Sequence, residues 1–313
     1  MICKRLASFF VPLGPLSFYE MNYRALLISL TLLFLSGCAA SRYARGPETE
    51  EIESALSHYD GTVRMVCYPS GEPHLSERRM TVYLPANYEV DRERRFPVMY
   101  LLHGARGNEV TWIERGDVLM TLDSLSRLGA VEDFILVLPN VNNYFSDKEY
   151  NNGHAIQAVR AFWIVDGETE VHFMQDVVNT VDSLFRTVQA PEGRAIAGMS
   201  TGGLQAMYLA ANHPDSFGYV GLFSPYAYDT VFGLRHPEFY GGIWRKLDRQ
   251  FETPPEYYGI MIGRKDFFLP HMTAVDRKMT RLGYGHEFIV SPGGHKWGNW
   301  RKYFIYFSQK AFR

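Results

Sequence analysis

The chain has 313 residues, of which 46% are hydrophobic and 21% charged, and its formal charge is −2 at pH 7. This length suits one large domain with a substantial core, and the absence of a basic cluster argues against nucleic acid as a partner. Three cysteines, Cys3, Cys38 and Cys67, are too few for a disulfide scaffold.

Residues 1–37 are predicted to be a signal peptide. The apolar run 25–35 follows Arg24 and is too short to span a bilayer comfortably, which fits the hydrophobic region of an export signal. It ends in Leu-Ser-Gly-Cys at 35–38, which resembles a bacterial lipobox in which the thiol of Cys38 receives a diacylglyceryl group. Met21 begins a normal signal sequence, so we expect translation to start there. A plain membrane anchor with Cys38 incidental is the alternative.

Cleavage before Cys38 would leave residues 38–59 as a lipidated tether with a short helix. We therefore expect the protein in the bacterial cell envelope, touching the membrane only through its lipid. Ala39 follows the cysteine rather than an aspartate, so nothing signals retention at the inner membrane. The periplasmic and outward faces both remain open. Cys67 lies in an apolar stretch, 63–68, and is expected to be buried in a strand.

Residues 60–313 are predicted to form a single catalytic domain of alternating strands and helices. Continuous apolar runs are typical of buried parallel strands, whereas 79–84 alternates apolar and polar residues, as an edge antiparallel strand would. The alternation of elements predicts a mostly parallel, doubly wound α/β sheet with helices on both faces. Strands are expected at 61–68, 79–84, 96–102, 134–140, 195–197, 219–223, 258–263 and 286–291, and helices at 118–128, 173–187, 204–211, 271–282 and 299–311.

A Gly-x-Ser-x-Gly motif at 198–202 lies between a predicted strand and a predicted helix. In that setting the motif is the nucleophile elbow of an α/β-hydrolase. Gly198 and Gly202 would remove Cβ atoms that collide as the helix folds back on the strand, and Ser200 would project from the sheet edge. The motif also arises by chance, and a glycine turn can be purely structural. The flanking strand and helix favour the catalytic interpretation.

An acid and a base follow later strands in the order that this fold requires. Sites in parallel sheets form beyond the carboxyl ends of the strands, where Ser200, Asp266 and His295 all fall. The imidazole of His295 would take the serine proton, and the carboxylate of Asp266 would fix its tautomer. A solvated loop aspartate and a loop histidine without a role are the alternatives. Asp276, in a helix, and Glu287, inside a strand, would face the wrong way.

An oxyanion needs two N–H donors. One is predicted to be the backbone amide of Thr201, which directly follows the nucleophile. The other should come from the loop after the strand at 96–102, and Ala105 is our choice. His103, in the same loop, is expected to shape the loop rather than to act as a catalyst.

Four stretches, at 82–85 (Val-Tyr-Leu-Pro), 101–104 (Leu-Leu-His-Gly), 195–203 and 293–297 (Gly-Gly-His-Lys-Trp), together resemble the esterase D family. That family includes feruloyl and acetyl-xylan esterases, S-formylglutathione hydrolases, enterobactin esterases and mycolyltransferases. The resemblance runs from about residue 60 to 311 and implies a Ser200–Asp266–His295 triad with no metal or organic cofactor. Thr201 stands where the family often carries methionine, but only its backbone amide would be used.

Substrate choice depends on two insertions, 144–168 and 225–256. Both are rich in aromatic side chains, which could overhang the site and stack on a sugar or an aromatic acyl group. Packing of these rings onto the body of the domain is the favoured alternative. The residues concerned are Tyr144, Phe145, Tyr150 and Trp163, with Asn151 and Asn152, in the first insertion, and Tyr226, Tyr228, Phe239, Tyr240 and Trp244 in the second.

Three functions remain open at this point. The first is an exported serine esterase that acts on acylated carbohydrate, such as feruloyl or acetyl esters, through an acyl-Ser200 intermediate. The second is acyl transfer to a sugar or lipid acceptor. The third is a carbohydrate-binding lipoprotein with an inactive hydrolase fold. The presence of Ser200, Asp266 and His295 argues against this third function. The acyl group, the alcohol, the oligomeric state and the membrane leaflet are not predicted.

Overall fold

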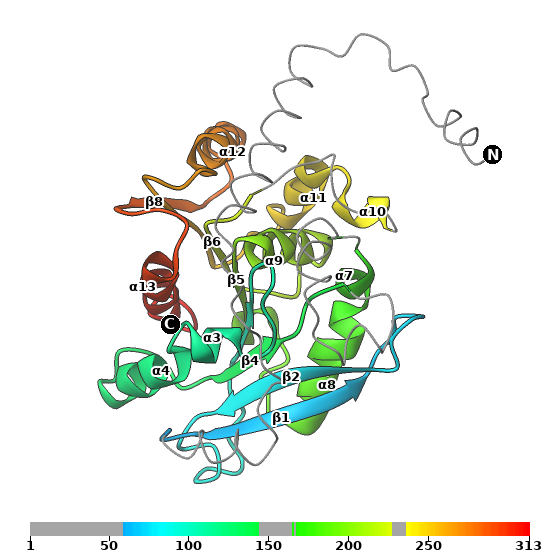
Figure 1. The fold of residues 1–313 in the computed structure, drawn as a ribbon, viewed down its shortest axis with the longest axis vertical. Coiled ribbons are helices and arrows are strands. Elements are labelled where there is room, and N and C mark those ends of the chain that lie inside the picture. The colour runs from blue at the N-terminus through cyan, green and yellow to red at the C-terminus, as the bar shows by residue number, and fades with distance from the viewer. Residues whose placement is uncertain (1–58, 144–164, 166, 227–235) are drawn as a thin grey trace, which may run out of the picture. The chain divides into compact units, whose positions relative to one another are not determined.

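The computed structural model describes residues 59–143, 165, 167–226 and 236–313 (Figure 1). The predicted signal peptide, Cys38 and nearly all of the tether lie outside these residues, as do 144–164 and 227–235. None of the helices in the described ranges combines the length and apolar character needed to cross a membrane.

Eight described strands form one sheet in the order β1-β2-β4-β3-β5-β6-β7-β8. β1 pairs antiparallel with β2 and β2 with β4, whereas all the pairs from β4 through β3 to β8 are parallel. The mostly parallel sheet is therefore confirmed. The strands are β1 (Thr62–Pro69), β2 (Glu77–Leu84), β3 (Val98–Leu102), β4 (Ile135–Pro139), β5 (Arg194–Met199), β6 (Tyr219–Phe223), β7 (Tyr257–Gly263) and β8 (Glu287–Ser291).

Helices cover both faces of the sheet, as predicted (Figure 1). Side chains alternate along a strand, so Met99 and Leu101 of β3 face one hydrophobic cluster while Val98, Tyr100 and Leu102 face the other. The first cluster is covered by α3 (Thr111–Glu114), α4 (Val118–Arg127) and α13 (Trp297–Ser308). The second is covered by α7 (Glu168–Phe173), the π-turn η1 (Met174–Val178), α8 (Asn179–Leu184), α9 (Thr201–Asn212), α10 (Pro237–Tyr240), α11 (Ile243–Gln250) and α12 (Leu269–Leu282). A 3₁₀ turn, η2 (Pro191–Gly193), precedes β5.

The prediction that residues 79–84 form an edge strand is wrong. β2 lies between β1 and β4, and the polar members of its alternating pattern, Thr81 and Tyr83, are as buried as the apolar ones. Burial of Tyr83 is tolerated because its hydroxyl donates a hydrogen bond to Asp123 of α4. The edge of the sheet is β1, which explains a second error. Cys67 lies on the solvent side of that edge strand and is exposed rather than buried.

The helix predicted at 173–187 has different ends. Helical structure begins at Glu168 and stops at Leu184. Arg186 accepts a hydrogen bond from the N–H of Phe96 at 2.8 Å, and Val188 donates one to the carbonyl of Phe96 at 2.9 Å. This backbone pairing competes with the helix and ends it early. The short helices α3, α10 and α11 were not expected from the sequence.

Candidate active site

Ser200 lies at the turn between β5 and α9 with φ 54° and ψ −117°. A positive φ is strained for a residue with a side chain, and such strain persists only where the surroundings impose it. Here the N–H of Ser200 donates to the carbonyl of Phe223 at 2.8 Å, and its carbonyl accepts from Leu204 at 3.1 Å. The end of β6 and the first turn of α9 therefore hold the serine in its strained conformation.

The two glycines of the motif permit two different close approaches. A Cβ on Gly198 would lie 2.3 Å from the carbonyl oxygen of Gly202, so this glycine lets α9 fold back on β5, as expected. A Cβ on Gly202 would instead lie 2.3 Å from the carbonyl oxygen of His103. The second glycine therefore makes room for the loop after β3 rather than for its own strand.

The structure brings Ser200, His295 and Asp266 together, although 95 residues separate the first two. His295 Nε2 lies 2.9 Å from Ser200 Oγ, and His295 Nδ1 lies 3.0 Å from Asp266 Oδ2. Because an ionised carboxylate only accepts hydrogen bonds, Nδ1 carries the proton and Nε2 is free to accept the serine proton. This arrangement can activate a serine nucleophile.

Backbone hydrogen bonds between two loops fix the acid relative to the base. Asp266 follows β7 and His295 follows β8. Between these loops, Arg264 N–H donates to the carbonyl of Ser291 and Lys265 N–H to that of Gly293, both at 2.7 Å. The distance between carboxylate and imidazole is therefore set by the backbone as well as by their own hydrogen bond.

Aromatic rings surround the imidazole of His295. Trp300 and Phe268 meet it edge to face, with ring centroids 5.0 and 5.5 Å away, and Phe267 lies at 4.6 Å. Trp300 and Phe268 are buried, whereas Phe267 is 45% exposed. None of the three was predicted from the sequence, although Phe267 and Phe268 directly follow Asp266. The two buried rings cover part of the imidazole, and the exposed ring of Phe267 leaves an apolar surface beside it.

The loop after β3 lies against the elbow, where an oxyanion donor is expected. A Cβ on Gly104 would be 3.4 Å from Ser200 Cβ. Thr201 is the first residue of α9, and the first N–H groups of a helix have no partner within it. A small cavity lies between the two predicted donors. Its walls are His103, Gly104, Ala105, Val141, Asn142, Asn143, Val165, Thr201 and Gln205.

His103 is buried and cross-links two loops. Its Nδ1 lies 2.8 Å from the carbonyl oxygen of Gly104, and its Nε2 accepts the N–H of Val141 at 3.0 Å. Since Nε2 accepts, Nδ1 carries the proton. Burial lowers the pKa of His103 to about 4. A neutral imidazole held at both nitrogens agrees with the predicted loop-shaping role.

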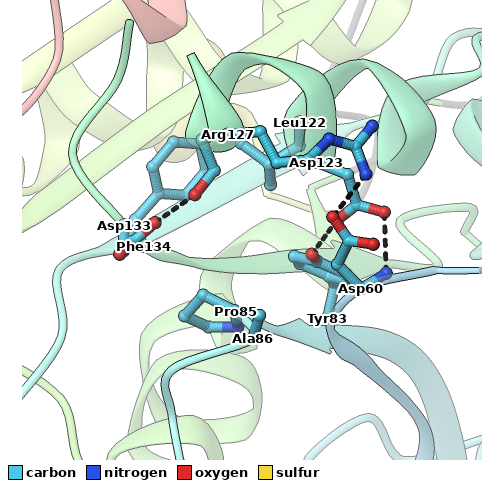
Figure 2. A pocket seen from close by; sticks show the side chains of 10 residues that line it. Asp60, Tyr83, Pro85, Ala86, Leu122, Asp123, Arg127, Asp133 and Phe134 are labelled. Atoms are coloured by element: carbon cyan, nitrogen blue, oxygen red, sulfur yellow. Dashed lines mark hydrogen bonds and ion pairs between the residues drawn. The ribbon is translucent and has the colours of Figure 1, made fainter. Parts of the chain in front are cut away.

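A larger hollow lies at the opposite end of the parallel strands, between β2 and α4 (Figure 2). The pairing of Tyr83 with Leu136 places it beside the amino end of β4, away from Ser200. Its carboxylates are bound internally: Asp123 accepts from Tyr83 and from the N–H of Asp60, and Asp60 pairs with Arg127. These contacts tie α4 to β2. Ser126 Oγ also donates to the carboxylate of Asp133 in this hollow, but no described histidine lines it to act as a base. Across the described residues, no group of His, Cys, Asp or Glu is arranged to hold a metal ion.

The described aromatic residues of the second insertion pack onto the domain. Tyr226, Phe239 and Tyr240 are buried in the core, and Trp244 packs partly buried against it. For these four, the packing alternative is confirmed. Tyr228 lies outside the described residues, as do the residues named in the first insertion.

Comparisons with known proteins support the same fold. The chain is 26% identical over 239 residues to an endo-1,4-beta-xylanase/feruloyl esterase of Xylanibacter ruminicola, a match that covers 74% of this chain and 29% of that protein. A ferulic acid esterase of Anaeromyces mucronatus superposes with a TM-score of 0.64 at 21% identity, covering 88% of this chain and 96% of the other. An S-formylglutathione hydrolase of Staphylococcus aureus superposes with a TM-score of 0.59 at 17% identity, covering 80% of this chain and 97% of the other. The chain thus spans less than a third of the length of the curated relatives that it matches.

The sequence profile of the family described as "Putative esterase" matches residues 74–264. This range runs from the hairpin before β2 to the end of β7 and contains the elbow at Ser200, but it stops short of Asp266 and His295. The placement of the acid and the base therefore depends on the geometry given above. With the matched range, the strand order and the structural neighbours in agreement, the chain belongs to this esterase family and has the α/β-hydrolase fold.

Proposed function

We propose that the protein is a serine carboxylic-ester hydrolase that acts on acylated carbohydrate. The observation that carries this proposal is the hydrogen-bonded series Asp266–His295–Ser200, built on a serine held at φ 54°. The family match supports ester hydrolysis as the class of reaction.

The reaction follows from the geometry. Ser200 Oγ attacks the ester carbonyl while His295 Nε2 takes the hydroxyl proton, and Asp266 stabilises the resulting imidazolium. The tetrahedral oxyanion accepts hydrogen bonds from the amides of Thr201 and Ala105. His295 then gives its proton to the departing alcohol oxygen, which leaves an acyl group on Ser200. Water, deprotonated by His295, attacks this acyl-serine and releases the carboxylic acid.

The relatives support an acylated carbohydrate as the substrate. One is a xylanase/feruloyl esterase, one structural neighbour was solved in complex with ferulic acid, and another is a feruloyl esterase module complexed with sinapinate. A hydroxycinnamoyl ester of a plant polysaccharide is therefore the substrate class we favour, with acetyl esters next.

The test uses residues 39–313 with methyl ferulate, p-nitrophenyl acetate and acetylated xylan. Ser200→Ala should lower kcat by on the order of 10⁴ or more. Ser224→Ala is a matched control: Ser224 also has a positive φ, of 48°, and is buried at the end of the neighbouring strand, but its hydroxyl has no hydrogen-bond partner among the described residues. Turnover that survives in Ser200→Ala would rule out the serine mechanism. Polysaccharide binding without turnover in the parent would favour the binding protein instead, and ester formation with an added sugar acceptor would reveal transfer.

We also propose that the full chain is anchored in the cell envelope through Cys38. The lipobox-like residues 35–38 support this proposal. Expressed in a bacterium fed with labelled palmitate, the parent should carry label and sediment with membranes, while Cys38→Ser should carry none. Equal labelling of both would contradict the proposal.

A further inference from the structure

We propose that a buried ion pair between Arg78 and Glu72 positions the oxyanion loop, residues 103–107. It acts through the segment 140–142 and His103. The inference rests on the proposed function, since it concerns the same serine site, but it does not depend on which ester is the substrate.

The sheet register brings Arg78 to the catalytic edge. β2 runs antiparallel to β4, with Met80 opposite Pro139, and Asn140 N–H donates to the carbonyl of Arg79 at 3.1 Å. Arg78, near the start of β2, therefore lies where β4 ends. β3 adjoins β4, and β5, which carries Ser200, adjoins β3. The Arg78 side chain is thus separated from the elbow by the two loops that follow β4 and β3.

The guanidinium of Arg78 holds the chain just beyond β4. Its Nη2 donates to the carbonyl oxygens of Asn140 and Asn142 at 2.7 and 2.6 Å. These carbonyls lie past the end of the strand, where the sheet no longer supplies donors, and a buried carbonyl without a donor is costly. Nη1 donates to the carboxylate of Glu72 and to Thr169 Oγ1, the latter at 3.1 Å. Arg78 and Glu72 are only 1% and 3% exposed, so the pair is shielded from solvent.

Val141, between the two held carbonyls, connects this pair to the oxyanion loop. Its N–H donates to His103 Nε2, and the other nitrogen of His103 donates to the carbonyl of Gly104, one residue before Ala105. The carbonyl of Val141 accepts a hydrogen bond at 2.9 Å from Gln205 of α9, the helix that begins at the elbow. The segment 140–142 is therefore fixed from β2, from the oxyanion loop and from the nucleophile's own helix.

Loosening this segment should affect the transition state more than the bound substrate. The amide of Ala105 is proposed to donate only to the developing oxyanion, and such donors must be aligned before the reaction. Loss of the Arg78 contacts should therefore lower kcat and leave KM nearly unchanged. If the ion pair were purely structural, its loss would instead lower the melting temperature and the fraction of active protein. Each remaining active site would then keep the parent's kcat.

The chain contains a comparable ion pair at the amino end of β5, the end of that strand away from Ser200. Arg194 Nη2 lies 2.5 Å from Asp182 Oδ2, and both side chains are largely buried. Arg194 is the first residue of β5, whereas Ser200 follows the last residue of that strand. The pair therefore resembles Arg78–Glu72 in chemistry, is somewhat more exposed, and lies at the end of the strands away from the oxyanion loop.

The experiment compares Arg78→Lys with Arg194→Lys in residues 39–313. Lysine keeps the charge but lacks the planar fork that bridges two carbonyls. The main readout is the second-order rate at which a fluorophosphonate labels Ser200, a reaction in which the Oγ–P bond forms, fluoride leaves and His295 takes the proton. Labelling to completion counts the active sites, and kcat, KM and the melting temperature are measured beside it. Thr169→Val is a milder second variant, which removes the longer contacts that the Thr169 hydroxyl makes with Arg78, Glu72 and the carbonyl of Asn142.

Arg78→Lys should lower both the labelling rate and kcat per site by about 10-fold or more, with KM within about twofold, and Thr169→Val should lower them less. Arg194→Lys should lower only the melting temperature. Labelling of both Arg78 and Thr169 variants at the parent rate would overturn the inference while leaving the proposed function intact. A parent that labels but hydrolyses no carbohydrate ester would overturn the proposed substrate, and the variants' labelling rates would still decide the inference. A parent that does not label would overturn both.

Discussion

Asp266 binds the imidazole of His295 with one carboxylate oxygen and the backbone N–H of Phe268 with the other, each at 3.0 Å. Its side chain is fully buried. The backbone hydrogen bond fixes the rotation of the carboxylate without help from the histidine. Asp266 can therefore select the orientation and tautomer of His295 rather than adapt to it.

Asp266→Asn should lower kcat by on the order of 10³- to 10⁴-fold with little change in KM. The amide can still accept the N–H of Phe268, but it would present a donor or a weaker acceptor to His295 Nδ1. The imidazole would then expose a protonated Nε2 to Ser200 more often and could not take its proton. Steady-state kinetics on methyl ferulate would measure the loss.

Asp276→Asn is the matched control for that substitution. Asp276 Oδ1 lies 3.1 Å from His286 Nε2, which forms a second aspartate–histidine pair between α12 and the start of β8. No serine hydroxyl of the described residues hydrogen-bonds to this pair, so its loss should leave kcat within about twofold. Equal losses in the two variants would contradict a special role for Asp266.

Gly202→Ala should damage both stability and activity. The added methyl group would lie 2.3 Å from the carbonyl oxygen of His103 and 2.7 Å from that of Leu102, so either the elbow or the oxyanion loop must move. We expect a loss of about 2 kcal/mol or more in the free energy of unfolding and at least a 10-fold lower kcat. Urea denaturation and kinetics on the refolded protein would measure the two effects.

Gly298→Ala provides the comparison for a glycine within a helix. An added Cβ at Gly298, in the first turn of α13, has nothing within 4 Å. Alanine there should stabilise the protein by about 0.5–1 kcal/mol and leave activity unchanged. If Gly202→Ala also stabilised the protein and left activity unchanged, the close approach of the loop after β3 would not matter for catalysis.

The sequence predicted the catalytic residues of the site better than the residues that hold the surrounding loops in place. Strands such as 96–102 are continuous apolar runs, and a parallel sheet collects its strand ends at one edge, so Ser200, Asp266 and His295 could be grouped from chain order alone. Sheet order is not a local property, however. The alternating pattern of β2 fitted an edge strand, and only the pairing with β4 shows that Arg78 reaches the oxyanion side.

Burial of polar residues was the other feature that local patterns could not provide. Nothing in the sequence marks Arg78 or Glu72 as buried, because charged residues are mostly exposed. Their burial depends on partners, such as Thr169, that are distant in the chain. Cys67 shows the converse: an apolar setting predicted burial, yet its position on an edge strand exposes it.

Phe267→Ala should impair esters with a large alcohol group more than esters with a small one. The ring of Phe267 lies 4.6 Å from the imidazole of His295 and is 45% exposed. His295 protonates the departing alcohol in the proposed mechanism, so an apolar surface beside it would face the alcohol rather than the acyl group. We expect KM for p-nitrophenyl acetate to rise by about 3- to 10-fold and KM for methyl ferulate to change less. Similar changes for both esters would argue against contact with the alcohol.

The buried His103 should make stability depend on pH between its two pKa values. Burial lowers the pKa from the ordinary value of about 6.5 to about 4, so in this range the unfolded chain binds a proton that the folded chain does not. The stability that this difference contributes is fully present above about pH 6.5 and is lost as the pH falls through the folded value. The loss attributable to His103 is on the order of 3 kcal/mol.

His103→Gln isolates this contribution, because glutamine does not titrate and its carbonyl oxygen could accept the N–H of Val141. The variant should be less stable than the parent at pH 7, and the gap in unfolding free energy should narrow as the pH is lowered toward 4. Urea denaturation at several pH values measures the gap, and the imidazole resonance of His103 reports its titration directly. A gap that stays constant with pH would mean that His103 is not the buried neutral link between Val141 and Gly104. The oxyanion loop would then need another support.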